Sequence, residues 1–195
     1  VTSNISNNFH IQKSRISTNP LLKLKYYSMH GQGQGNQCTT KTLGDIKESG
    51  FTISTDIPKA MGGKNTAPQP VELLLSSLCG CEQSTANFLA RHMKPRMKIS
   101  KIEFYLEAVR DPSTVLALPL PLSHAEMEER EREKESNEDV PARLQRIWGR
   151  AVVYTDADDS QIQLLASLIE KRCPVADMIK RSGCIVEIEW SRGRE

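Results

Sequence analysis

The chain has 195 residues, of which 38% are hydrophobic and 26% charged, and its formal net charge is +2. This composition is ordinary for a soluble protein of one core, and the small net charge by itself indicates no class of partner. No apolar run reaches the roughly 18 residues of a membrane-spanning helix, so we expect no membrane span. Five cysteines are an odd number and too sparse for a secreted disulfide framework, which predicts a reducing intracellular compartment.

The first 30 residues differ from the rest of the chain. They are rich in Ser, Asn and Thr, carry several basic residues, and precede the first acidic residue, Asp45. This pattern resembles a mitochondrial transit segment, and a plain flexible tail is the alternative. We therefore expect a basic extension over 1–30 and one domain over 31–195, in a mitochondrial or cytoplasmic setting. Scattered basic residues are weak support for nucleic-acid binding, so a nucleic-acid partner is not expected.

The first half of the domain is predicted to begin with a hairpin. Glycines loosen its start, and Gln37–Leu43 and Phe51–Thr55 have the composition of strands. Pro70 suits the first turn of a helix, which we expect to run to Met93. Alternation of apolar and polar residues predicts a half-buried strand around Ile102–Ala108.

The second half is predicted to repeat the order of strands and helix. A charged insertion at about 111–139, containing a short solvated helix, comes first. A strand over Ile147–Thr155 then leads to a helix capped by an aspartate or serine near Asp158, bent at Pro174 and ended at Gly183. A last strand follows, and the order β-β-α-β-β-α-β predicts an α+β fold.

Two cysteines lie on or beside the apolar stripes of the two predicted helices. At about 100° per residue, Cys81 falls near the buried side of the first helix and Cys79 at its rim. Cys173 falls on the core face of the second helix. If the stripes meet, the Cys81 and Cys173 thiols face each other, which suits thiol redox chemistry. A free cysteine on an apolar face is otherwise a small hydrophobic residue.

The segments around both cysteines resemble the OsmC/Ohr family. The run GGKNTAPQPVELLLSSLCGC at Gly62–Cys81 is similar to the family's first signature. Pro141–Trp148 and Glu170–Val175 resemble the surroundings of its second cysteine. The likeness covers about 32–110 and 140–190, in the family's order.

The resemblance implies an OsmC-like fold, in which antiparallel sheets wrap two central cysteine-bearing helices of an intertwined homodimer. It also implies a thiol peroxidase of the oxidative stress response. Cys81 would be the peroxidatic thiol that reduces an organic hydroperoxide and becomes a sulfenic acid. Cys173 would be the resolving thiol that forms a disulfide with it, and a lipoyl or thioredoxin-type dithiol would reset the pair. No cofactor and no metal are implied.

Two positions depart from the family's peroxidases. Those proteins have a glutamate directly after the helix-opening proline, whereas this chain has Val71 there and Glu72 one residue later. They also hold the thiolate with an arginine of the hairpin, and 31–56 contains none; Lys41, Lys47 and His30 are the nearby candidates. The chain therefore resembles the broader OsmC-like branch, with Glu72 as a weaker candidate for support of Cys81.

Two alternatives to a peroxidase remain open from the sequence. The first is a non-catalytic OsmC-like subunit of a larger mitochondrial assembly, which would use the extension and the insertion as binding surfaces. The second is a zinc or copper(I) site formed by Cys79, Cys81, Cys173 and His92. The one-residue spacing of the first two cysteines departs from zinc-site patterns, so the metal site is the less favoured alternative.

Overall fold

The computed structural model describes residues 27, 29–42, 50–111, 124–125 and 142–193. The chain forms two compact units, which comprise 1–69 and 70–195. Nearly all of the basic extension and of the charged insertion, and the helix expected within the insertion, lie outside the described residues. Among the residues that are described, no helix combines the length and the hydropathy needed to cross a bilayer.

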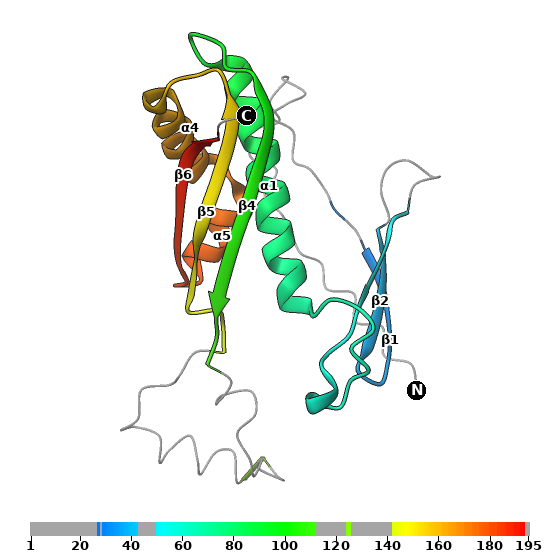
Figure 1. The fold of residues 1–195 in the computed structure, drawn as a ribbon. Coiled ribbons are helices and arrows are strands. Elements are labelled where there is room, and N and C mark those ends of the chain that lie inside the picture. Colours follow the sequence, from blue (N-terminus) through cyan, green and yellow to red (C-terminus); the bar gives the residue numbers. More distant parts are fainter. Residues whose placement is uncertain (1–26, 28, 43–49, 112–123, 126–141, 194–195) are drawn as a thin grey trace, which may run out of the picture. The chain divides into compact units, whose positions relative to one another are not determined.

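The first unit contains a three-stranded antiparallel sheet in the order β1-β2-β3 (Figure 1). Its strands are β1 (Met29–Gln34), β2 (Gln37–Thr42) and β3 (Thr52–Thr55). The sequence predicted only the second and third strands, and its interpretation of the glycine-rich start was wrong. Gly31 and Gly33 pair with β2, and the turn that follows is possible because Gly35 adopts φ 58°.

A buried carboxylate organises the loop that follows β3. Asp56 is fully buried and accepts hydrogen bonds from the backbone N–H groups of Ile57, Lys64 and Thr66 and from the Thr66 hydroxyl. The Thr66 backbone N–H is the largest cause that lowers the pKa of the Asp56 carboxyl well below its usual range. These hydrogen bonds hold the loop, which contains a 3-10 turn at Lys59–Met61, around the Asp56 side chain.

The second unit begins with the long helix α1 (Pro70–His92), which has Pro70 at its first position as expected. It ends one residue before the predicted Met93. Its buried side chains follow helical spacing and include one carboxylate: Leu78, Glu82, Ala86, Leu89 and Ala90.

The sheet of the second unit has the order β4-β5-β6, with strands β4 (Ile99–Val109), β5 (Arg146–Thr155) and β6 (Ile185–Gly193). β4 and β5 are antiparallel, whereas β5 and β6 are parallel. The expectation of purely antiparallel sheets was therefore wrong for this unit. The reason is the helical crossover between β5 and β6. It carries the chain back to the end of the sheet where β5 begins, so that β6 runs in the same direction as β5.

The crossover consists of two helices rather than one bent helix. α4 (Asp159–Arg172) begins at a capping box formed by Asp158 and Gln161, which confirms the expected cap. α5 (Pro174–Arg181) begins immediately after Cys173, and Gly183 at φ 87° ends it as predicted. Because Pro174 has no N–H to donate, the helix stops there instead of bending.

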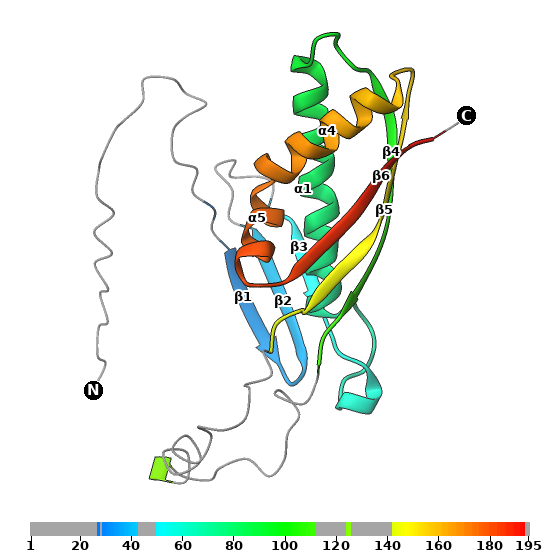
Figure 2. The same cartoon turned by 90° about the vertical axis from the view of Figure 1, so that its left-hand side faces the viewer.

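All three helices lie on one face of the β4-β5-β6 sheet (Figures 1 and 2). α1 packs against α4, α5 and β4, and both crossover helices pack against β6. The largest fully buried apolar side chains between these layers come from α1, β5 and α4 and are Leu78, Ile147, Val153, Ile162, Leu165 and Ile169. Burial of this apolar surface fixes α1 against the α4–α5 junction.

We expect Asp56→Asn to loosen the 56–66 loop. The amide has one acceptor oxygen, and its NH2 group would face backbone N–H donors. Amide hydrogen exchange at Lys64 and Thr66 should become at least about tenfold faster. Asp159→Asn, at the exposed start of α4, should change neither amide, and unchanged exchange in Asp56→Asn would contradict this account.

Candidate functional site

The structure places the thiols of Cys81 and Cys173 beside each other. Cys81 lies in the middle of α1, is partly buried and packs against the core of the second unit. Cys173 is fully buried, and its thiol lies within hydrogen-bonding reach of that of Cys81. Both thiols are free, so this arrangement is a reduced pair of neighbouring cysteines.

Cys173 owes its position to the break between α4 and α5. It is the last cap of α4 and the first cap of α5, with extended backbone at φ −76° and ψ 111°. Its N–H still bonds the Ile169 carbonyl at 2.8 Å, and its own carbonyl accepts from Asp177 at 3.0 Å. Both helices thus hold the backbone of this one residue, which fixes the direction of its side chain.

The two thiols have different surroundings. Burial raises the pKa of the Cys173 thiol to about 11, and the hydrogen bond with Cys81 and the charge of Glu82 act in the same direction. The Ala176 backbone opposes this rise without cancelling it. Cys173 is therefore held as a neutral thiol, whereas the partly exposed Cys81 is the member of the pair that a substrate can reach.

A third group at this site, Glu82, was missed by the sequence analysis. Its side chain is 4% exposed, and its Oε2 atom is buried without a hydrogen-bond partner among the described residues. The sequence does contain a signal for its burial, which is helical spacing. Glu82 lies four residues from both Leu78 and Ala86 and so falls on the buried stripe of α1. A carboxylate at such a position is rare unless it is paired.

Burial dominates the electrostatics of Glu82. It raises the pKa of the Glu82 carboxyl to about 7, against an opposing effect of the Lys180 ammonium. Lys180 is itself bound to Glu170 at 2.6 Å, so it does not neutralise Glu82 by direct contact. Burial and the Glu82 charge also raise the pKa of Cys79. A proton-accepting group therefore lies within electrostatic reach of two of the site's cysteines.

A cavity of about 310 Å³ opens beside Glu82. Its polar lining comes from α1, α4, α5 and β6 and consists of Glu82, Gln163, Ser167, Glu170, Lys180 and Glu187. Trp190 and Ile188 of β6 contribute apolar surface. This cavity connects the buried carboxylate to polar groups at the protein surface.

The other predicted supporting residues belong to other parts of the chain. Glu72 is exposed in the first turn of α1, about two and a half turns from Cys81 along the same helix. Its support of Cys81 therefore stays a prediction that would require a second copy of the chain. Lys41 and His30 belong to strands of the first unit, and Lys47 lies outside the described residues.

The four candidate ligands of the alternative metal site are not gathered in one place. In the described part of the chain, no three His, Cys, Asp or Glu side chains converge as metal ligands. His92 is exposed at the end of α1, three turns beyond Cys81, and its ring bonds the Phe88 carbonyl at 2.7 Å.

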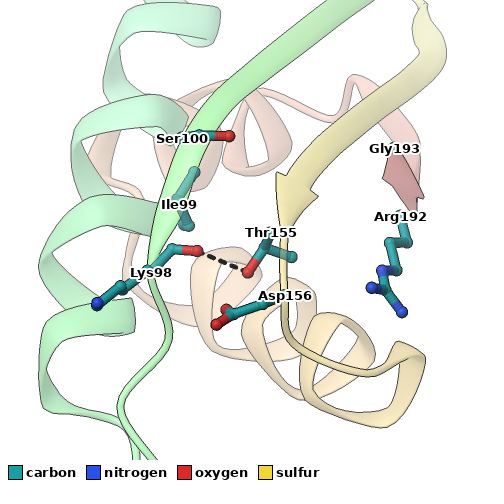
Figure 3. A pocket seen from close by; sticks show the side chains of 7 residues that line it. All are labelled: Lys98, Ile99, Ser100, Thr155, Asp156, Arg192 and Gly193. Carbon is teal, nitrogen blue, oxygen red and sulfur yellow. Dashed lines mark hydrogen bonds between the residues drawn. The ribbon is translucent and has the colours of Figure 1, made fainter. Parts of the chain in front are cut away.

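A larger cavity lies away from the cysteines. It measures about 540 Å³ and is lined by residues at the ends of β4, β5 and β6: Lys98, Ile99, Ser100, Thr155, Asp156, Arg192 and Gly193 (Figure 3). The Thr155 hydroxyl donates to the Lys98 carbonyl at 2.6 Å and ties two of these ends together. None of its lining residues is a thiol, so we place the candidate site at the cysteine pair.

We expect Glu82→Gln to change how stability depends on pH. An unfolded chain loses the Glu82 proton near pH 4.5, whereas the folded chain keeps it until about pH 7. The free energy of unfolding of the wild type therefore falls between these pH values, by roughly 2–3 kcal/mol. Glu82→Gln lacks this loss and should be more stable than the wild type at pH 8 but not at pH 4.5, as measured by urea unfolding.

Glu187→Gln is the matched control, since Glu187 borders the same cavity but is exposed. It should follow the pH dependence of the wild type. If the free energies of unfolding of the wild type and Glu82→Gln change in parallel from pH 4.5 to 8, burial does not raise the pKa of the Glu82 carboxyl.

Comparison with solved structures gives a consistent architecture. An OsmC-like protein from Mycoplasma pneumoniae matches with a TM-score of 0.61 and 18% identity, over 87% of this chain and 99% of that chain. A protein from Legionella pneumophila described as an organic hydroperoxide resistance protein OsmC matches at 0.57 and 14%, over 88% and 99%. The organic hydroperoxide resistance protein OhrB of Bacillus subtilis matches at 0.51 and 18%, over 86% and 99%. At these identities the matches establish the fold.

No curated protein matches the chain. The model of the family described as OsmC-like protein matches residues 63–189, which contain α1, both crossover helices, Cys81, Glu82 and Cys173. Since this match spans more than half of the sequence and agrees with the fold, the chain belongs to the OsmC-like protein family.

Proposed function

We propose that this protein is a thiol-dependent peroxidase that reduces organic hydroperoxides in oxidative stress defence. The observation that carries the proposal is the contact between Cys81 and Cys173, which come from separate helices and distant parts of the sequence. Structurally similar proteins from Legionella and Bacillus are described as organic hydroperoxide resistance proteins, which agrees with this reaction class.

Cys81 is the attacking thiol in this proposal. Its thiolate takes the terminal oxygen of the hydroperoxide, releases the alcohol and becomes a sulfenic acid. Cys173 then attacks that sulfur, so that water leaves and a Cys81–Cys173 disulfide forms. A small dithiol of the lipoyl or thioredoxin type reduces the disulfide and regenerates both thiols. The greater exposure of Cys81 and the full burial of Cys173 suit this order of events.

A second copy of the chain is the proposed partner. Gly80 lies on the outer side of α1, and a Cβ atom added there would meet no described atom within 4 Å. Ser77, Ser84 and the half-exposed Phe88 share this side of the helix. A glycine at this position allows another backbone to pack close, and no described part of this chain does so. We propose that the same face of a second copy occupies this space in a homodimer, in a mitochondrial or cytoplasmic setting.

The peroxidase role predicts distinct losses in the two cysteine variants. Cys81→Ser should reduce turnover of cumene hydroperoxide with a dithiol reductant to the uncatalysed rate, because the attacking sulfur is gone. Cys173→Ser should form the Cys81 sulfenic acid in the first turnover and then stall or over-oxidise. Stopped-flow loss of hydroperoxide and dimedone labelling of Cys81 measure these two outcomes.

Cys184→Ser is the control for loss of a buried thiol outside the site, and it should retain turnover. Activity that persists in Cys81→Ser would remove the assigned role. A wild type that turns over no hydroperoxide would favour the alternative of a non-catalytic subunit in a larger assembly.

The proposed dimer is tested at Gly80. Gly80→Leu should shift a wild-type dimer toward monomer in analytical ultracentrifugation, because the new side chain occupies the space assigned to the second copy. The helix content of the chain should not fall, since leucine favours helix over glycine by about 1 kcal/mol. Lys171→Leu, at an exposed position of α4, is the control and should leave the association unchanged. A dimer of unchanged affinity in Gly80→Leu would place the interface elsewhere.

A further inference from the structure

Glu82 has no role in the steps described so far, yet its burial is costly. It occupies a core position of α1 that an apolar side chain would fill at lower free energy. Its Oε2 atom is buried and has no hydrogen-bond partner among the described residues. A buried carboxyl with an unpartnered oxygen points to a role in chemistry.

The charged and titratable groups around Glu82 come from its own helix, the α4–α5 junction, both crossover helices and β6. On its own helix they are Cys79 and Cys81, and at the helix junction the neighbour is Cys173. Across the cavity they are Glu170 of α4, Lys180 of α5 and Glu187 of β6. Burial favours the neutral form of Glu82, whereas Lys180 favours its charged form. Glu82 is thus balanced between its two forms near neutral pH.

Cys173 is the neighbour that needs such a group. Its thiol is fully buried and strongly favours the protonated form, so very little thiolate is present at neutral pH. Only a thiolate attacks a sulfenic acid or a disulfide at a useful rate. The closing step therefore requires that a base remove the Cys173 proton as the new sulfur–sulfur bond forms.

We propose that Glu82 is the base that accepts the Cys173 proton when Cys173 closes the disulfide with Cys81. This inference rests on the proposed function. The Glu82 carboxylate takes the proton, the Cys173 sulfur bonds to the Cys81 sulfur, and the Cys81–OH bond breaks. The departing hydroxide receives a proton from the Glu82 carboxyl and leaves as water, so the carboxylate is restored and only one water is released.

The cavity beside Glu82 provides the space that the released water needs. It has room for water, its volume is about 310 Å³, and its rim carries the Lys180–Glu170 ion pair. When a dithiol reduces the disulfide, the proton transfer is reversed. The Cys173 sulfur leaves as the disulfide bond breaks, and it takes a proton from the Glu82 carboxyl. One carboxyl thereby serves both directions of the thiol–disulfide exchange.

The test isolates disulfide closure from hydroperoxide chemistry. The reduced protein is oxidised either with one equivalent of cumene hydroperoxide or with 5,5′-dithiobis(2-nitrobenzoate), which forms a mixed disulfide at Cys81 that Cys173 resolves. Acid quenching and peptide mapping follow the Cys81–Cys173 disulfide from pH 6 to 9. In the wild type the closing rate should rise through about pH 7 and then level off, as Glu82 becomes charged.

Glu82→Gln should close the disulfide about 100-fold more slowly at pH 8, a typical loss for a general base. Its rate should keep rising with pH without a plateau, because the Cys173 thiol must then ionise unaided. Lys180→Met keeps the base but removes the positive charge that favours its charged form, so its plateau should be reached at higher pH. Glu187→Gln, at the rim of the same cavity, should match the wild type in rate and profile.

The outcomes separate the two proposals. A wild type that closes with the aromatic disulfide but not with the hydroperoxide would overturn the peroxidase function and leave the role of Glu82 to be decided by its variants. Glu82→Gln closing at the wild-type rate with the wild-type pH profile would overturn the role of Glu82 alone. No closure of the wild-type pair with either oxidant would overturn both.

Discussion

The break between α4 and α5 is the constraint on which the candidate site depends. Pro174 cannot donate the hydrogen bond that would continue α4, so the chain is extended for one residue at Cys173. That residue is held by the last turn of one helix and the first turn of the next, and its thiol is directed into the core against α1. The burial of α1 against both crossover helices then brings Cys81 to it. An uninterrupted helix would carry Cys173 as an ordinary core residue.

The core of the second unit contains a buried carboxyl, that of Glu82, which lowers the stability of the fold. Most of its buried side chains are apolar, but the stripe of α1 includes a carboxyl that burial makes hard to ionise. Such a group weakens the fold as the pH rises from about 4.5 to about 7, and at the same time it supplies the base that the neighbouring buried thiol lacks. Stability and chemistry are therefore opposed at Glu82, which is common where a protein holds a reactive group away from water.

Much of the fold was accessible from the sequence because local signals agree with the final packing. The proline that opens α1, the Asp158 cap and the glycine after α5 each act within a few residues, and all three were predicted. β1 was missed because its glycines weaken any strand pattern, and only pairing with β2 makes it a strand. The parallel pairing of β6 was missed because strand direction depends on the crossover rather than on the composition of the strand.

The candidate site was accessible in part for the same reason. Helical phase and the resemblance of the flanking motifs identified Cys81 and Cys173, since each thiol lies near its helix's apolar stripe. Glu82 lies even closer to the centre of that stripe, but a glutamate beside a cysteine was not weighed as a core residue. Its burial depends on α4, α5 and β6 together, which no local pattern contains.

The most direct measurement of the central claim is peptide mapping of the protein after one equivalent of an organic hydroperoxide. The account predicts one disulfide-linked peptide pair containing Cys81 and Cys173, formed through a Cys81 sulfenic acid that dimedone traps. A protein that remains fully reduced, or one whose linked peptides join other cysteines, would contradict it.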